Sequence, residues 1–167
     1  MMISGPPKEG VELAFEPIRE GWSVYKTKPA GAVIRLKLVL LKILLLDVDD
    51  VGAKFATGVN IIVTATVPQN QKGIKADKQP TQEEIQKSIV EPDIEYDTVK
   101  EEWNEYDVEG IKVGAKLVAT VISRTSLFDT NGDPIYNVQY QTVFKPATPE
   151  DKEKWLKIKN ERLPVKQ

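Results

Sequence analysis

The clearest pattern in the chain is an alternation of side chains along 135–144. One set of alternate positions, from Tyr136 to Thr142, carries most of the apolar bulk, whereas the other set carries asparagine and glutamine. Alternation at period two is typical of a strand with one buried face. The preceding stretch, 116–128, is rich in valine, isoleucine, threonine and leucine, and DTNGDP at 129–134 supplies turn-forming residues. We therefore predict two strands joined by a turn.

A second apolar run, 36–46, is dominated by leucine and is apolar at both odd and even positions. Because leucine also favours helix, periodicity alone leaves strand and helix open. The turn-like DVDDVG at 47–52 and the likeness to 116–128 favour a central strand. Such a strand needs cover on both faces, and a second subunit could supply the outer cover. We expect a homo-oligomer whose interface includes Val39, Leu41, Ile43 and Leu45.

Two segments, 22–68 and 103–146, share an order of residues that predicts an internal repeat. Each begins with a W-x-x-Y pair and continues with a glycine, a strand that contains Lys-Leu-Val, and a turn that contains aspartate. Each ends with a threonine followed four residues later by a proline. A chance likeness between two hairpins is the alternative reading. We interpret the recurring aromatics as packing at the core or at the seam between the segments, with stacking on a ligand as the alternative. These aromatics are Trp22, Tyr25, Trp103 and Tyr106.

Two short helices complete the predicted elements. TQEE at 81–84 is a capping-box pattern, and Pro92 ends the helix that it starts. Thr148 precedes Pro149 and two acidic residues, which predicts a C-terminal helix over about 148–162. We expect a single domain, 1–167, in which 69–102 connects the two related segments.

The composition excludes several kinds of chemistry. The chain has no cysteine and no histidine, so it can form no disulfide, no Cys-ligated metal centre and no imidazole-based catalytic pair. The run at 36–46 is too short for a membrane span and is interrupted by Lys37 and Lys42. The first ten residues lack the layout of a secretory signal. We expect a cytoplasmic protein with no membrane contact, no cofactor and no metal site.

The charge distribution bears on nucleic acid as a partner. Segment 77–109 holds twelve acidic residues against three lysines, which leaves a balance of +7 elsewhere in a chain of net charge −2. The basic remainder could contact phosphates, but the overall pI of about 5.4 argues against this. Nucleic acid is therefore not the favoured partner, and an OB- or SH3-like nucleic-acid-binding barrel is kept as an alternative.

Carboxylate chemistry is the second alternative. With 25 acidic residues, carboxylate pairs are plentiful, but no spacing marks two that face each other across a pocket. A carboxylate-dependent enzyme would place its site at the seam between the two segments. The sequence singles out no catalytic residue, and we do not expect an enzyme.

The order of features in 103–146, from W-x-x-Y through glycine, strand and aspartate turn to a second strand, resembles small uncharacterised β-rich proteins of thermophilic archaea, here in doubled form. The resemblance implies a β-rich fold and such a source, and it assigns no activity to any residue. We expect a mainly β protein with minor α content, in which two β-meanders of about three strands form one pseudo-twofold barrel or sandwich. The expected function is that of a non-catalytic, self-associating binding or scaffold protein.

Overall fold

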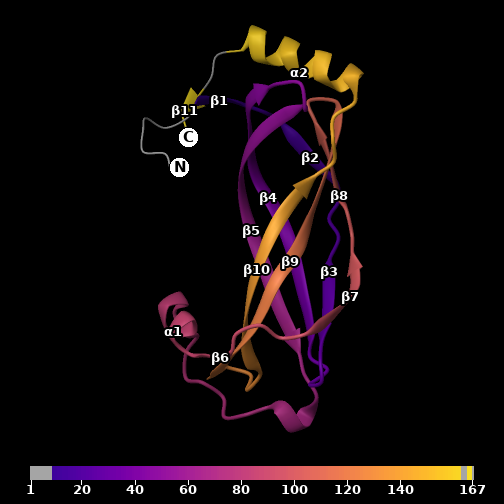
Figure 1. The fold of residues 1–167 in the computed structure, drawn as a ribbon. Coiled ribbons are helices and arrows are strands. Elements are labelled where there is room, and N and C mark those ends of the chain that lie inside the picture. Colours follow the sequence, from indigo (N-terminus) through magenta and orange to yellow (C-terminus); the bar gives the residue numbers. More distant parts are fainter. Residues whose placement is uncertain (1–8, 163–164, 167) are drawn as a thin grey trace.

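Two antiparallel β-sheets share one hydrophobic core, and a helix lies across one end of both (Figure 1). The computed structural model describes residues 9–162 and 165–166. A long central strand organises each sheet: β4 (Val33–Val48) in the first and β9 (Ile111–Phe128) in the second. Within the described residues, no helix combines the length and the apolar character needed to cross a bilayer.

The first sheet has six strands arranged around β4. One edge of β4 pairs along its whole length with β5 (Ala53–Thr66). The opposite edge pairs with β3 (Ser23–Thr27) at the start of β4 and with β1 (Glu9–Glu12) near its end. Beyond β3 lies β7 (Tyr96–Glu101), and beyond β1 lies β11 (Val165–Lys166).

The second sheet has five strands arranged around β9 in a similar way. One edge of β9 pairs with β10 (Pro134–Phe144). The opposite edge pairs with β8 (Asn104–Val108) at the start of β9 and with β6 (Ile89–Glu91) near its end. Beyond β8 lies β2 (Phe15–Arg19).

Two strands are exchanged between the segments. Strand β2 directly precedes β3 in the chain but pairs with β8, whereas β7 directly precedes β8 but pairs with β3. Each sheet is therefore completed, at one edge, by a strand from the other half of the chain. Neither strand was predicted from the sequence.

A β-bulge explains why the leucine-rich run is apolar at odd and even positions. From Ile34 to Leu40 the even positions are buried, but the register shifts between Leu40 and Lys42, after which Ile43 and Leu45 turn inward. Such a bulge places one extra residue in the strand and reverses the phase of its side chains. Leu41 lies at the shift and is 56% exposed. The run is thus a strand, as predicted, whose core-facing side chains change phase at the bulge, and Leu44, on the other face, is also buried.

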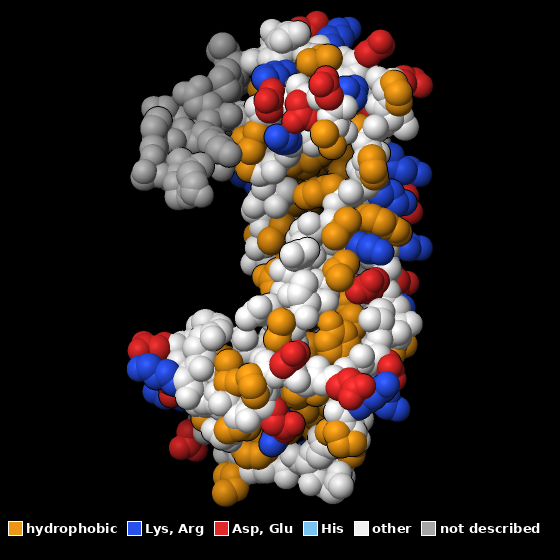
Figure 2. Space-filling model, viewed as in Figure 1, with side chains coloured by type: hydrophobic (Ala, Val, Ile, Leu, Met, Phe, Trp, Pro, Cys, Tyr) orange, Lys and Arg blue, Asp and Glu red, His pale blue; other side chains and the backbone are white. Residues whose placement is uncertain are grey.

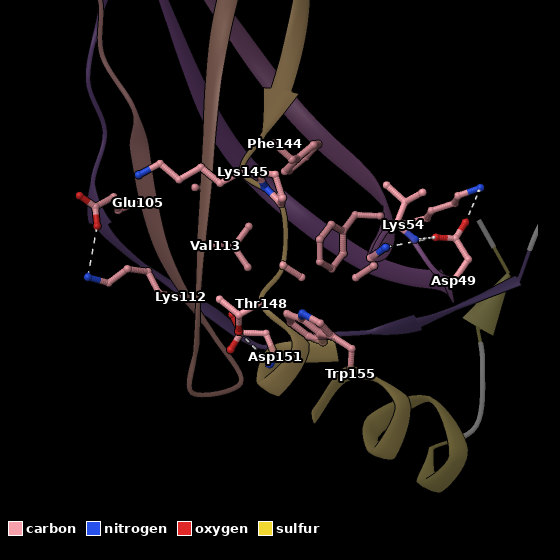
Figure 3. A pocket seen from close by; sticks show the side chains of 17 residues that line it. Asp49, Lys54, Glu105, Lys112, Val113, Phe144, Lys145, Thr148, Asp151 and Trp155 are labelled. Atoms are coloured by element: carbon pink, nitrogen blue, oxygen red, sulfur yellow. Dashed lines mark hydrogen bonds and ion pairs between the residues drawn. The ribbon is translucent and has the colours of Figure 1, made fainter. Parts of the chain in front are cut away.

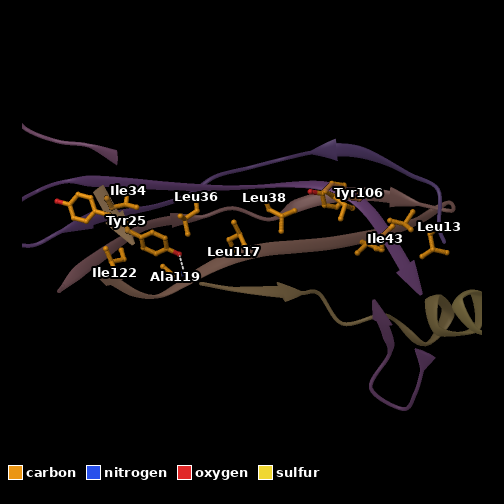
Figure 4. Packing of buried hydrophobic residues seen from close by; sticks show 14 of the residues in the cluster. Leu13, Tyr25, Ile34, Leu36, Leu38, Ile43, Tyr106, Leu117, Ala119 and Ile122 are labelled. Carbon is orange, nitrogen blue, oxygen red and sulfur yellow. Dashed lines mark hydrogen bonds between the residues drawn. The ribbon is translucent and has the colours of Figure 1, made fainter. Parts of the chain in front are cut away.

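The core lies between the inward faces of β4 and β9 (Figure 4). It combines aliphatic side chains from both central strands with two tyrosines, Tyr25 and Tyr106, that are fully buried. Polar atoms also join the sheets: the Ser23 hydroxyl donates to the Leu117 carbonyl oxygen at 2.6 Å, and the Ala119 amide donates to the Tyr25 hydroxyl at 2.9 Å. The two sheets are therefore fixed in register by hydrogen bonds as well as by apolar packing.

Both predicted helices are present, but the first ends at Lys87 and not at Pro92, because Ile89–Glu91 pair with β9 as strand β6. Helix α1 (Gln82–Lys87) follows a complete capping box between Thr81 and Glu84, and helix α2 (Pro149–Glu161) follows a cap from Thr148. A short 3₁₀ helix, η1 (Gln69–Gln71), lies in the connection before α1. The described residues form two separate sheets and no closed barrel, so the barrel alternative is not found.

Candidate functional site

Strands β5 and β10 leave one side of the molecule open. Within the described residues, β5 pairs only with β4 and β10 only with β9, so each presents an unpaired backbone edge. These edges also lack charge: Lys54 is the one charged residue in the 14 residues of β5, and none occurs in the 11 residues of β10. Edge strands are usually protected by lysine, proline or a bulge, because a bare edge invites another strand to pair with it.

The two opposite edges of the sheets are protected in that way. Strand β7 contains Asp97, Lys100 and Glu101, whereas β2 contains Glu16, Pro17 and Arg19. Charges and proline oppose the addition of a further strand. The open side of the molecule is therefore the side formed by β5 and β10.

The inward faces of β5 and β10 are apolar but only partly covered. In β5, Val63 lies opposite the buried Leu36 and is 43% exposed, and in β10, Tyr140 lies opposite the buried Ala119 and is 41% exposed. Figure 2 shows hydrophobic side chains gathered in a hollow that runs from below the C-terminal helix into the body of the molecule. A narrow apolar gap between the two strands contains Val59 and Phe144 among its lining residues.

This gap adjoins a cavity of about 470 Å³ beneath α2 (Figure 3). Three aromatic rings line it: the Phe55 ring centre lies 5.7 Å from that of Phe144 and 5.3 Å from that of Trp155. Trp155 comes from α2, Phe55 from β5 and Phe144 from β10, so the cavity closes one end of the open side. Its volume is in the range typical of small-molecule sites.

Helix α2 is held over the cavity by ionic contacts at both ends. Lys159 pairs with Asp47, and the Lys152 ammonium donates to the Asp50 carbonyl oxygen, which fastens the helix to the β4–β5 turn. Arg162 makes two hydrogen bonds to Glu109, at 2.9 and 2.6 Å, which fasten its end to the β8–β9 turn. The Arg162 guanidinium accordingly lowers the pKa of the Glu109 carboxyl.

Most charges around the cavity are already paired. Lys54 lies 3.0 Å from Asp49, whose pKa it lowers, and Lys112 lies 3.4 Å from Glu105. The stem of Lys145 passes over Gly114, where a Cβ atom would lie 2.7 Å from Lys145 Cδ, and its ammonium ends 4.9 Å from the centre of the Trp103 ring. Paired charges at the rim leave the apolar interior as the main recognition surface.

The structure divides the four predicted aromatics into two kinds. Tyr25 and Tyr106 are buried between the sheets, and their hydroxyls donate to Glu101 at 2.5 Å and to Glu20 at 3.0 Å. Burial is the main cause, and the carboxylate hydrogen bond the second, of the raised pKa of each phenol. Both tyrosines thus pack between the two sheets, and a seam between two related segments stays a prediction.

The tryptophans lie outside the core, each beneath a lysine. The Lys37 ammonium lies 5.4 Å from the Trp22 ring centre, and the Lys116 ammonium lies 4.7 Å from the Trp103 ring centre. Both indoles are half-buried. A cation over an aromatic face is attracted by the ring quadrupole, so these pairs stabilise the outer surfaces of the sheets.

The four predicted interface residues are also divided. Ile43 and Leu45 are buried in the core of the chain itself, whereas Val39 is half-buried and Leu41 is exposed. The bulge in β4 separates the two pairs. The open edges of β5 and β10 were missed by the sequence analysis, although the absence of charge over 55–71 and 134–144 could have indicated them.

The aspartate-rich turns serve the backbone. Asp49 accepts the amides of Val51 and Gly52, and Asp129 accepts the amides of Asn131 and Asp133. Over the described residues, no three side chains of histidine, cysteine, aspartate or glutamate are grouped so that they could hold a metal ion. Turn chemistry of this kind stabilises the hairpin loops.

Comparisons with known proteins give no match. No family model matches the chain, and no curated protein and no solved structure is similar enough to it to count as a match. The open side and the cavity are therefore the features of the molecule that bear on its function.

Proposed function

We propose that the chain is a non-catalytic binding protein that assembles with further copies of itself through strands β5 and β10. The observation that carries this proposal is the contrast between the edges of the two sheets. Strands β2 and β7 carry five charged residues and Pro17 lies inside β2, whereas β5 and β10 carry one charged residue between them and Pro134 stands only at the first position of β10. Protection of one pair of edges and not the other is what a self-pairing surface requires.

The same contrast favours a second copy of the chain as the partner. A strand added to β5 or β10 gains main-chain hydrogen bonds along the edge and covers the half-exposed residues Val63 and Tyr140. An uncharged edge strand rich in β-branched and aromatic residues pairs well with a second strand of that kind. Every copy of the chain has two such edge strands, β5 and β10. The exposed Leu41 lies on β4, adjacent to β5, where a neighbouring copy could cover it as well.

We further propose that the two segments are related by a pseudo-twofold axis, which makes β5 and β10 equivalent. Matching hairpins turn at Gly31 and Gly110, with φ of 76° and 83°. The Tyr25 hydroxyl donates to Glu101 at the end of β7, and the Tyr106 hydroxyl donates to Glu20 directly after β2. A lysine ammonium lies over each of the two tryptophan rings. Equivalent edges would let one surface serve both isologous dimers and larger closed assemblies.

Light scattering coupled to size-exclusion chromatography tests the assembly. The wild-type chain should elute with a mass that is at least twice the 18.7 kDa of one chain. The double variant Val63→Lys with Tyr140→Lys should shift to the monomer mass, because it places a charge on each open edge at a half-exposed position that tolerates lysine.

The matched control is Val99→Lys on β7, where the side chain is 59% exposed on a protected edge. This variant should keep the wild-type mass. A wild-type monomer over a wide concentration range, or equal masses for the double variant and the wild type with folding verified by circular dichroism, would overturn the proposal.

Nucleic-acid binding is the second candidate, and it is favoured by the surface around Trp103. Lys116 and Lys145 both lie within 5 Å of this ring, and Arg19 donates to the Trp103 carbonyl oxygen. An indole among cations is a common platform for single-stranded nucleic acid. Gel shifts at low and high salt test it: the double variant Lys116→Gln with Lys145→Gln should weaken binding, and no shift at low salt rejects the candidate.

The third function, a carboxylate-dependent enzyme at the seam, has less support. The carboxylates at the seam, Glu20 and Glu101, accept hydrogen bonds from Tyr106 and Tyr25, and each tyrosine orients its own partner. Neither carboxylate lines the cavity beneath α2. We therefore keep the binding and assembly role as the proposed function.

A further inference from the structure

The cavity beneath α2, at one end of the open side, has the features of a small-molecule site. Phe55, Phe144 and Trp155 surround it on three elements, and Val113 of β9 adds an aliphatic wall. A cavity of this volume with an aromatic and aliphatic wall is typical of pockets for small organic molecules. Its lining also carries charged side chains, three lysines and three acidic residues, and their pairing bears on which molecule fits.

Asp151 supplies an acidic group inside this cavity. The other acidic residues of the lining, Asp49 and Glu105, pair with Lys54 and Lys112. Over the described part of the chain, no lysine or arginine nitrogen lies within ion-pair distance of the Asp151 carboxylate, although its backbone amide donates to Thr148 Oγ1. Among the described residues, the Asp151 carboxylate is therefore an acidic group of the cavity to which no basic side chain is paired.

The helix presents Asp151 and Trp155 to the cavity together. They are four residues apart, so they lie on one face of α2, and Figure 3 shows both reaching from the helix toward Val113 and Phe144. Asp151 lies in the first turn of the helix. A carboxylate next to aromatic rings is the arrangement that recognises organic cations, since the rings attract the same positive charge.

We propose that this cavity binds an organic cation, an amine or quaternary ammonium with an apolar body, whose nitrogen pairs with Asp151 and whose body packs against Phe55, Phe144 and Trp155. The inference is independent of assembly through β5 and β10, because it needs only residues of one chain. An anionic ligand would have to compete with existing contacts of the three lysines, because Lys54 and Lys112 pair with carboxylates and the Lys145 ammonium lies over the Trp103 ring.

Calorimetric titration with three probes of similar size tests the charge preference. Benzyltrimethylammonium should bind with one site per chain, benzyl alcohol should bind at least roughly tenfold more weakly, and benzenesulfonate should bind more weakly than either. Two-dimensional NMR with benzyltrimethylammonium should shift the Trp155 indole signal, assigned from the Trp155→Phe spectrum.

Two variants of adjacent residues locate the interaction. Asp151→Asn keeps the size of the side chain and should weaken benzyltrimethylammonium binding roughly tenfold, with no such effect on benzyl alcohol. Glu150→Gln is the matched control, because it removes the same charge from the same helical turn at an exposed side chain that pairs with Lys154 outside the cavity.

The outcomes separate this inference from the assembly proposal. Equal affinity for the three probes, an equal effect of Asp151→Asn and Glu150→Gln, or no binding of benzyltrimethylammonium would overturn the cation site. The mass measured by light scattering should be the same for Asp151→Asn and the wild type, so failure of one proposal does not mimic failure of the other.

Discussion

Replacing Tyr25 with phenylalanine should destabilise the protein, because it removes the hydroxyl group that joins the two sheets. Tyr25 is fully buried, and its hydroxyl both accepts the Ala119 amide at 2.9 Å and donates to Glu101 at 2.5 Å. The substitution keeps the ring and its packing but leaves the Ala119 amide of the opposite sheet without an acceptor. The effect therefore measures how much the hydrogen bond between the sheets contributes to folding.

The expected magnitude follows from the two lost bonds. A buried amide without a partner costs about 1–3 kcal/mol, while Glu101, which is only partly buried, can turn to water and costs less. We expect a loss of about 2 kcal/mol in the free energy of unfolding, which corresponds to a fall in Tm of roughly 4–8 °C for a chain of this length.

Urea unfolding followed by circular dichroism measures the change. The midpoint should fall while the slope with urea concentration stays constant, since the surface exposed on unfolding is unaltered. Tyr140→Phe is the control: this ring is 41% exposed, and the change should stay within about 0.5 kcal/mol of the wild type. If Tyr25→Phe is as stable as Tyr140→Phe, the hydroxyl has no role in joining the sheets and the reasoning is refuted.

Two further predictions concern ionisable groups. The folded-state pKa values of Tyr25 and Tyr106 are raised above the ordinary value of 10.0. Because the unfolded chain therefore loses these protons first, the contribution of each tyrosine to the free energy of unfolding is complete below pH 10 and is lost as the pH rises beyond it. The free energy of unfolding should therefore fall above pH 10 by up to about 1.4 kcal/mol per pH unit for each tyrosine, and the Tyr25→Phe variant should show a shallower decline in urea titrations at each pH. Arg162→Gln should lower stability at pH 7 by about 1 kcal/mol or less, because the pair with Glu109 is partly exposed. Since Arg162 lowers the pKa of Glu109, the wild-type advantage should vanish as the pH falls through the depressed pKa, and an advantage that persists in thermal melts under strongly acidic conditions would contradict the assigned pair.

The central strands and both helices could be predicted because each has a local pattern. The capping residues Thr81 and Thr148 mark the helix starts, and alternation marks β10. The exchanged strands could not be predicted, because β2 includes Pro17 and has mostly exposed side chains and β7 is exposed at four of six positions. Their pairing depends on partners 69 to 93 residues away in the chain, and no local pattern reports such distances.

The candidate site was harder to predict than the fold. The leucine-rich run suggested an interface on β4 because a bulge at Leu41 cannot be distinguished from a strand that is apolar on both faces. The cavity depends on Phe55, Phe144 and Trp155, which lie in three different elements. Their proximity follows from the placement of α2 by its contacts with two hairpin turns, which only the folded chain shows.

The exchange of β2 and β7 also sets an order of events during synthesis. Strand β3 ends at Thr27, but its partner β7 begins at Tyr96, and β2 must wait for β8 in the same way. A nascent chain that ends after the first segment would expose the bare edge of β3 and an unpaired β2, so it could not complete its first sheet on the ribosome. Such long-range pairing slows folding. The doubled pattern in the sequence therefore does not mean two folding units: the halves must reach the native state together.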